Sequence, residues 1–129
     1  MKKALVAFVP LAILTSLGVL LYFEGFIGDS PARVTREHSI SLPLSATNIH
    51  CDGTFAITTL GDFSAYASFE VAQSDLPGIL SQFRMERPPE QDGNQTVYSF
   101  ESRDGNFGTI RTSTVANSRV AVSIGTSWN

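Results

Sequence analysis

The pattern of hydrophobic and polar positions divides the chain into two unequal parts. Residues 4–23 carry no charge, and their apolar side chains fall on every side of a helix rather than along one stripe. At about 1.5 Å per residue, a helix of this length extends roughly 30 Å, which equals the hydrocarbon thickness of a bilayer. Beyond residue 37 the apolar positions recur in short alternating groups instead. The pattern predicts a transmembrane helix over residues 4–23, followed by a small folded domain.

The residues on either side of the apolar run predict its orientation and allow two interpretations, an uncleaved membrane anchor or a cleaved secretory signal. Lys2 and Lys3 precede the run, so residues 1–3 are expected to form a cytoplasmic tip and the remainder to be exported. A secretory signal cleaved near Ala32 is the alternative, because Ser30 and Ala32 are small residues suited to a cleavage site. The apolar run is longer than the roughly 7 to 15 residues of a usual signal core, which favours an uncleaved anchor.

The composition after the apolar run predicts where the folded domain begins. Residues 24–37 mix charges with Gly25, Gly28 and Pro31, and are interpreted as a short tether. Residues 38–129 are then expected to form one extracytoplasmic domain in the periplasm or at the cell exterior. A segment of this length supports one modest core and is too short for two.

Alternating apolar and polar residues recur throughout the predicted domain. A period of two places every second side chain on the same face of a strand, so each group predicts a strand with one apolar face. Pro43 places the first strand at a sheet edge, because proline has no amide hydrogen to donate to a neighbour. The alternating groups cover residues 40–44, 49–51, 54–58, 65–71, 96–101, 107–115 and 119–126, and the group at 54–58 is expected to be the second or third strand.

One amphipathic helix is expected among these strands. Ser74 is its predicted N-cap, and Pro88 stops it. With the alternating groups, this helix predicts an α+β domain, a mostly antiparallel sheet of about five or six strands with one packed helix. The apolar stripe of the helix, spaced as i, i+3, i+4 and i+7, consists of Leu76, Ile79, Leu80 and Phe83.

Charge and cysteine content exclude several functional classes. From Val34 onward the chain has six arginines, ten acidic residues and no lysine, a net charge of −4. This balance offers no basic patch for nucleic acid or for anionic lipid headgroups. Cys51 is the single cysteine, so it cannot form a disulfide within the chain, and its position in an alternating run predicts a small buried hydrophobe.

Three segments of the chain carry a resemblance to other sequences. The segments are residues 40–49 (Ile-Ser-Leu-Pro-Leu-Ser-Ala-Thr-Asn-Ile), residues 67–71 (Ala-Ser-Phe-Glu-Val) and residues 74–80 (Ser-Asp-Leu-Pro-Gly-Ile-Leu). Together they form a pattern "LPxSAxNI, FEV, SDLPxIL" that resembles a loose set of small, uncharacterised bacterial exported or membrane-anchored proteins. The resemblance implies a bacterial envelope protein and brings no activity and no functional residues.

Candidate chemistry is confined to one group of residues. His38, His50 and Asp52 are the side chains that could hold a metal or act as acid and base, and His50 and Asp52 would share one strand face. The expected alternative is that all three are solvent-exposed residues at strand ends. The sequence contains no phosphate loop, nucleophile elbow or paired-cysteine motif, so we assign no catalytic, cofactor-binding or metal residues and expect no cofactor.

The leading hypothesis is a non-enzymatic, membrane-anchored interaction domain. It would contact the bilayer through residues 4–23 and bind another envelope protein or itself, without binding nucleic acid. Tyr66, Tyr98 and Trp128 could contribute to the contact surface, or could serve ordinary sheet packing. Alternative hypotheses are a small envelope hydrolase or metal-dependent enzyme that uses His38, His50 and Asp52, and an inhibitor or immunity-type envelope protein.

Overall fold

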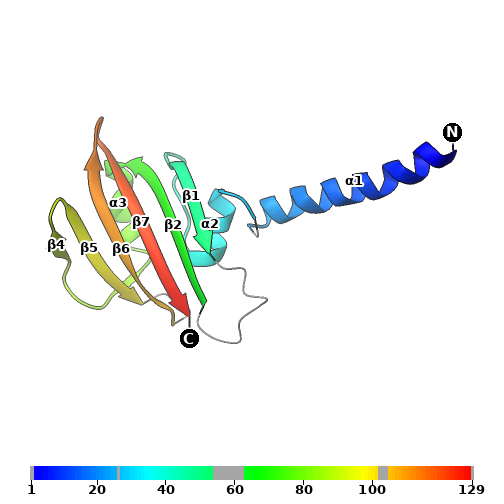
Figure 1. Cartoon of the computed structure of the whole chain (residues 1–129). Coiled ribbons are helices and arrows are strands. Elements are labelled where there is room, and N and C mark those ends of the chain that lie inside the picture. The colour runs from blue at the N-terminus through cyan, green and yellow to red at the C-terminus, as the bar shows by residue number, and fades with distance from the viewer. Residues whose placement is uncertain (1, 26, 54–62, 102–104, 129) are drawn as a thin grey trace.

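The computed structural model describes residues 2–25, 27–53, 63–101 and 105–128, with side chains from Phe8 onward except those of Phe63 and Trp128 (Figure 1). The helices are α1 (Lys2–Phe23), α2 (Pro31–His38) and α3 (Leu76–Leu80), and a 3-10 turn, η1 (Gln73–Asp75), precedes α3. The strands are β1 (Thr47–Gly53), β2 (Phe63–Ala72), β3 (Arg84–Met85), β4 (Glu90–Asp92), β5 (Gln95–Glu101), β6 (Phe107–Val115) and β7 (Arg119–Trp128).

All the described strands belong to one sheet of seven, in which every pair is antiparallel. The order along the sheet is β1-β2-β7-β6-β5-β3, and β4 also pairs with β5. The C-terminal strand β7 therefore lies between β2 and β6. The α+β class and the mostly antiparallel sheet are confirmed, and the sheet has one strand more than the expected five or six.

The difference in strand number comes from particular segments. Strands β3 and β4 are short strands on either side of Pro88 and Pro89 and were not predicted. The strand expected over residues 54–58 lies outside the described residues. The strand expected over residues 40–44 does not form, although Ile40 is buried.

A side chain takes the place of the strand predicted at residues 40–44. The Ser41 amide donates to Gln82 Oε1 at 2.7 Å, and Gln82 Nε2 donates back to the Ser41 carbonyl at 2.9 Å. Alternation also fails at Leu44, which is fully exposed. The segment passes over the core in an irregular conformation because its backbone groups are satisfied without a neighbouring strand.

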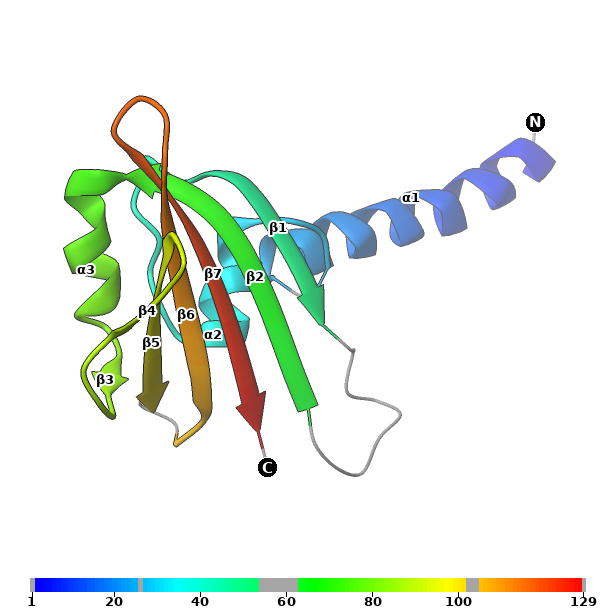
Figure 2. The same cartoon turned by 60° about the vertical axis from the view of Figure 1, so that its left-hand side comes forward.

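Both short helices lie on one face of the sheet (Figure 2). Val34 of α2 and Ile79 of α3 join the same buried cluster as the inward side chains of the inner strands. The largest buried side chains of that cluster are Phe69, Phe100, Ile79, Ile110 and Ile124. The alternation predicted for residues 65–71 is confirmed, because Ala65, Ala67, Phe69 and Val71 are all buried.

Residues 31–38 are helical and packed on the domain, so the prediction of a tether through residue 37 is wrong for this stretch. Ser30 is the N-cap, and its side chain accepts a hydrogen bond from the Arg33 amide at 3.2 Å. Val34 and His38, one turn apart, are 0% and 2% exposed. The spacing of these two residues gives α2 a narrow inward face, which a composition rich in charge and proline concealed.

The connection between α1 and α2 is compact. Gly25 has φ 80°, and a Cβ there would lie 2.5 Å from the Ala32 carbonyl oxygen. Gly28 has φ 81°, and a Cβ there would lie 2.5 Å from the Tyr22 ring. Both positions therefore need glycine, for the left-handed backbone and for the close approach of neighbouring groups.

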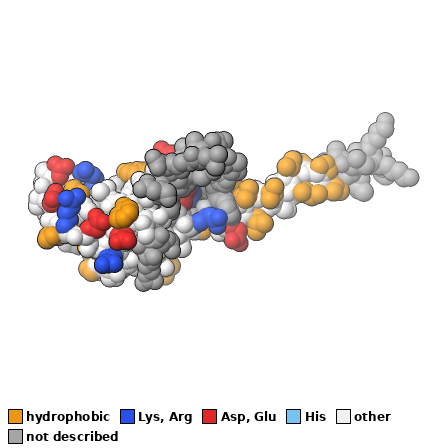
Figure 3. Space-filling view, turned by 90° about the horizontal axis from the view of Figure 1, so that it is seen from below, with side chains coloured by type: hydrophobic (Ala, Val, Ile, Leu, Met, Phe, Trp, Pro, Cys, Tyr) orange, Lys and Arg blue, Asp and Glu red, His pale blue; other side chains and the backbone are white. Residues whose placement is uncertain are grey.

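Helix α1 projects from the domain, and residues 4–23 lie within it (Figure 1). Its described apolar side chains are exposed along its length (Figure 3). Phe8, Leu14 and Phe23, for example, are 73%, 65% and 69% exposed. Within the described part of the chain, no helix is both long enough and apolar enough to cross a membrane.

The helix predicted from Ser74 to Pro88 is much shorter than expected. Residues 73–75 form the turn η1, and α3 then runs for five residues without a side-chain N-cap from Ser74. Asp75 instead accepts a hydrogen bond from Ser45 Oγ at 2.6 Å. Phe83 leaves the helix and packs against Phe100, with ring centroids 4.4 Å apart. Glycine at position 78 weakens a longer helix. The packing of Phe83 on the sheet can therefore outweigh the continuation of the helix.

Candidate functional site

The three residues singled out for chemistry do not share one site. His38 is buried on the covered side of the sheet, where its Nδ1 lies 2.7 Å from Thr126 Oγ1. His50 and Asp52 are exposed on the opposite face of β1, on either side of the buried Cys51. The expectation of an exposed residue is confirmed for His50 and Asp52 and wrong for His38. Among the described residues, no group of three or more histidine, cysteine or carboxylate side chains is placed to hold a metal ion.

The buried His38 side chain packs α2 against the sheet, and its ring is too buried to transfer a proton to a ligand at the surface. Burial lowers the pKa of its imidazole to about 4, so the ring is neutral at physiological pH. Its Nε2 is buried and has no hydrogen-bond partner among the described residues. The interaction with Thr126 joins α2 to β7 across most of the length of the domain sequence.

Cys51 behaves as the sequence predicts, as a small buried hydrophobe. It is 7% exposed, and burial raises the pKa of its thiol to about 11. A thiol with such a pKa stays protonated at neutral pH and is a poor nucleophile.

The side chain of Asp29 closes the outer edge of β1. Its Oδ1 accepts a hydrogen bond from the Cys51 amide at 2.8 Å, and this bond lowers the pKa of the Asp29 carboxyl. Its Oδ2 lies 3.4 Å from His50 Nδ1. An amide that already has an acceptor is not free to pair with an incoming strand, so strand addition is blocked at this position of the edge.

The opposite edge of the sheet is interrupted rather than capped. Strands β3 and β4 pair with different parts of β5, and the prolines at 88 and 89 lie between them. Arg111 of β6 reaches across to Asp92 of β4 at 3.0 Å. Short strands and prolines are common at edges that do not accept another strand. The sheet also has a face opposite the helices, which the described helices leave uncovered and which we call the open face (Figure 2).

The open face is made of small, mostly uncharged side chains. Residues directly opposite one another form rows across the inner strands, because the register of β2, β7 and β6 is regular. One row is Ser68, Ser123 and Arg111, and the next is Tyr66, Gly125 and Thr109. A third row is Ser64, Ser127 and Phe107.

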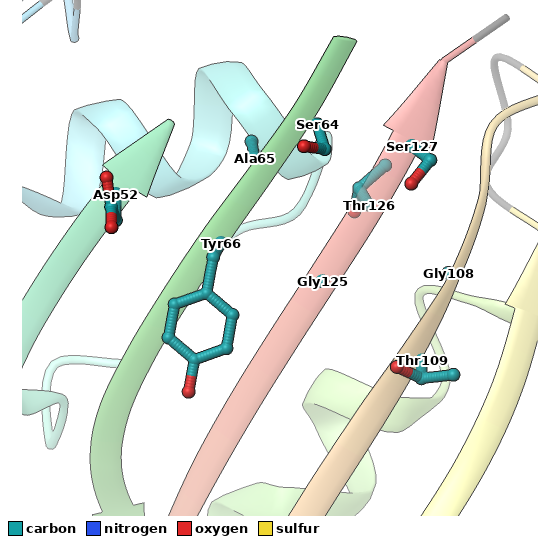
Figure 4. Close-up of a pocket in the computed structure, with 9 residues that line it drawn as sticks. All are labelled: Asp52, Ser64, Ala65, Tyr66, Gly108, Thr109, Gly125, Thr126 and Ser127. Atoms are coloured by element: carbon teal, nitrogen blue, oxygen red, sulfur yellow. The ribbon is translucent and has the colours of Figure 1, made fainter. Parts of the chain in front are cut away.

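The middle row contains a shallow hollow of about 550 Å³ (Figure 4). Gly125 forms its floor, and the side chains of Tyr66 and Thr109 stand on either side of it. Asp52 belongs to the hollow from β1, because it is the direct neighbour of Tyr66 in the register. The lining residues are Asp52, Ser64, Ala65, Tyr66, Gly108, Thr109, Gly125, Thr126 and Ser127.

Gly125 leaves space that another residue would fill. A Cβ built at this position meets no atom within 4 Å, and its φ lies outside the left-handed region. The hollow therefore owes its depth to the missing side chain rather than to an unusual backbone. Two aromatic side chains of the open face, Tyr66 and Phe107, are 45% and 49% exposed.

The described lining offers few kinds of chemical group. Its polar groups are hydroxyls and one carboxylate, and the described lining contains no histidine, cysteine or second carboxylate that could activate a nucleophile. Of the aromatic residues considered for a contact surface, Tyr66 is on the open face and Tyr98 packs against the core. The side chain of Trp128 lies outside those described.

Strand alternation alone could have indicated which residues share a face with Tyr66, but not that Gly125 and Thr109 lie beside it. That neighbourhood depends on the insertion of β7 between β2 and β6. Comparison with protein-family models, with curated proteins and with solved structures finds no match to this chain.

Proposed function

We propose that this protein is a membrane-anchored, extracytoplasmic protein-interaction domain without enzymatic activity, and that it binds its partner over the open face. The observation that carries the proposal is the hollow at Gly125 with the exposed Tyr66 beside it. The anchor we propose is the uncharged segment 4–23, whose length matches the hydrocarbon thickness of a bilayer. The preceding lysines favour a cytoplasmic N-terminus and an exported domain.

The composition of the open face supports a protein partner. Tyrosine provides a large and rigid contact surface at small cost in conformational entropy, and serine and glycine provide adaptable hydrogen bonds around it. This combination characterises antibody binding sites. The middle row and its neighbours contain the same residue types, with Tyr66 at the centre and Ser64, Ser68, Ser123 and Ser127 around it.

The openness of the hollow argues against a small soluble ligand. Small-molecule sites are concave and bury most of the ligand surface. Here every described lining residue belongs to β1, β2, β6 or β7 of the one sheet, so the hollow is a depression in the sheet surface (Figure 4). A protruding part of a larger molecule fits this shape, because the surrounding face can make further contacts.

The compact connection between α1 and α2 holds the domain next to its anchor. Helix α2 and strand β1 lie nearest to α1, and β4 lies at the far end of the domain (Figure 1). Partners of the open face would therefore be proteins of the same membrane or of its immediate surroundings. The resemblance to small bacterial envelope proteins accords with this location.

Site-specific photocrosslinking in native membranes tests the proposal. A photoreactive residue replaces Ser123 in the open face, and a matched one replaces Gly78 of α3 on the covered side. We expect one defined protein adduct from position 123 and none from position 78. Equal adducts from both positions, or crosslinks to lipid alone, would contradict an interaction through the open face. The mass of the mature protein shows in the same sample whether residues 4–23 are retained.

A further inference from the structure

Resting on the proposed function, we infer that the hollow at Gly125 receives an arginine side chain from a protruding loop of the protein partner. The guanidinium group would stack on the Tyr66 ring and pair with the Asp52 carboxylate. The hydroxyl of Ser64, which lies on β2 two residues before Tyr66, would accept one of its remaining N–H donors. Asp52, Ser64 and Tyr66 all line the hollow.

The carboxylate of Asp52 favours a positively charged group in any ligand that covers it. It is exposed, and within the described residues it has no ion pair or hydrogen bond. An apolar group that covered it would leave a buried charge without a counter-charge, which is costly. An acidic group would be repelled. Only a cationic or strongly donating group can fill the hollow without these penalties.

The chain's own arginines on this face are engaged elsewhere. Arg111 pairs with Asp92 at 3.0 Å and reaches Gln95. Arg119 donates to the carbonyl groups of Ser45 and Glu70 at 2.8 and 3.0 Å. Neither contacts the hollow, so its carboxylate is left to a group from outside the described chain.

The aromatic wall selects arginine over lysine. Asp52 and Tyr66 face each other across β1 and β2, so their side chains are neighbours on one face. A planar guanidinium can stack on the ring and keep its edge directed at the carboxylate, whereas an ammonium group is a compact and strongly hydrated charge. Arginine is also among the residues most enriched at energetically dominant interface positions.

The space and the remaining polar groups accommodate this side chain. A hollow of about 550 Å³ exceeds the volume of one arginine side chain and leaves room for the loop that carries it. Thr109 and Ser127 lie on β6 and β7 and present hydroxyl oxygens to the loop that carries the arginine (Figure 4). The guanidinium itself would meet the Asp52 carboxylate, which can accept two of its five N–H donors, and the Ser64 hydroxyl.

A library of disulfide-closed loops displayed on phage tests the inference, and the loops themselves serve as the probe. The full chain in phospholipid nanodiscs is the target, and empty nanodiscs remove lipid binders. We expect enriched loops to share an arginine at a fixed position. Replacing that arginine with lysine should weaken binding about tenfold, because stacking and bidentate pairing are lost together.

Three variants of the chain locate the contact. Asp52→Asn keeps the shape of the hollow and removes its charge, and Gly125→Val fills the floor. Each variant should bind an arginine-containing loop at least tenfold more weakly than the unchanged chain does. Gly78→Val is the matched control, because a Cβ at Gly78 also meets no atom within 4 Å and lies on α3. This control should bind as the unchanged chain does, and circular dichroism verifies that all three variants fold.

The outcomes separate this inference from the proposed function. Some loops could lose binding when a bulky residue replaces Ser123, yet bind equally well without arginine or to the Asp52→Asn variant. Such loops would overturn the arginine inference and leave binding through the open face intact. Self-association of the full chain that Gly125→Val abolishes, with no arginine loop enriched, would also overturn it, because a second copy would then occupy the hollow. Loops that ignore both the hollow and Ser123 would overturn both proposals.

Discussion

The two faces of the sheet are built from alternate residues of the same strands and have opposite properties. On the covered face Phe69, Ile110 and Ile124 are at most 2% exposed. On the open face their sequence neighbours Ser68, Thr109 and Ser123 are small and polar. Large side chains on one face exclude water and hold the helices, whereas small ones on the other leave a flat and hydrated surface interrupted by Tyr66 and Phe107.

Truncation of a core aromatic should give the largest effect and the sharpest contrast between the faces. Phe69→Ala removes a fully buried ring, and we expect the free energy of unfolding to fall by about 3 to 5 kcal/mol. Its neighbour Ser68→Ala, on the open face, should change stability by no more than about 0.5 kcal/mol. Urea unfolding of the full chain followed by far-ultraviolet circular dichroism measures both. Equal losses would show that the open face is covered in the folded protein.

Acidification should weaken the covered face through His38. Its pKa is about 4 in the folded protein and about 6.5 in the unfolded chain, so below pH 6.5 the unfolded chain binds a proton that the folded protein does not. Stability is therefore fully present above pH 6.5 and falls by about 1.4 kcal/mol per pH unit until about pH 4. Thermal unfolding at several pH values should show this slope.

A variant without the imidazole identifies the source of the pH dependence. His38→Gln cannot titrate and retains a hydrogen-bonding group toward Thr126, so the slope between pH 6.5 and 4 should disappear. The pKa of Asp29 is lowered below its usual value, so its own effect is expected at still lower pH. A slope that persists in His38→Gln would assign the effect to another group.

Two glycines that face opposite sides of the sheet give a matched test of packing. A Cβ at Gly108 would collide with the Gly125 carbonyl oxygen and approach the Phe100 ring, so Gly108→Ala should destabilise the domain by about 1 to 3 kcal/mol. Gly125→Ala enters open space and should change stability by no more than about 0.5 kcal/mol. Chemical unfolding of the two variants compares them directly. Similar losses would mean that the hollow is filled in the folded chain.

The smallest expected effect concerns the cap of α2. Ser30→Ala removes the acceptor for the Arg33 amide and should reduce stability by about 1 kcal/mol. Thr35→Ala, an exposed substitution within the same helix, is the control and should not be destabilising. Hydrogen exchange of the α2 amides should accelerate in the first variant only. Unchanged exchange would indicate that packing of Val34 alone holds the helix.

Much of the local structure followed from the sequence. The alternation in residues 65–71, 107–115 and 119–126 predicted β2, β6 and β7, and the same alternation assigned Cys51 to the buried side. These predictions succeeded because the orientation of a strand side chain depends on a period of two within a few residues. The exposed position of Asp52 followed in the same way.

Contacts between distant residues decided the remainder. The tether prediction failed at Val34 and His38 because α2 is stabilised by the sheet, through a contact such as His38 to Thr126, 88 residues away. The strand predicted at residues 40–44 was replaced by hydrogen bonds to Gln82. The local sequence pattern around residues 31–38 gives no sign of Thr126, and the pattern at residues 40–44 gives no sign of Gln82.

The chain's own order of residues thus determined which side chains share a face, and tertiary structure decided which of them meet. Tyr66, Gly125 and Thr109 form one row only because β7 inserts between β2 and β6. Side-chain direction is a local property of an extended backbone, whereas strand order depends on the packing of the whole sheet. The candidate binding site depends on strand order, so it could be located only from the tertiary structure.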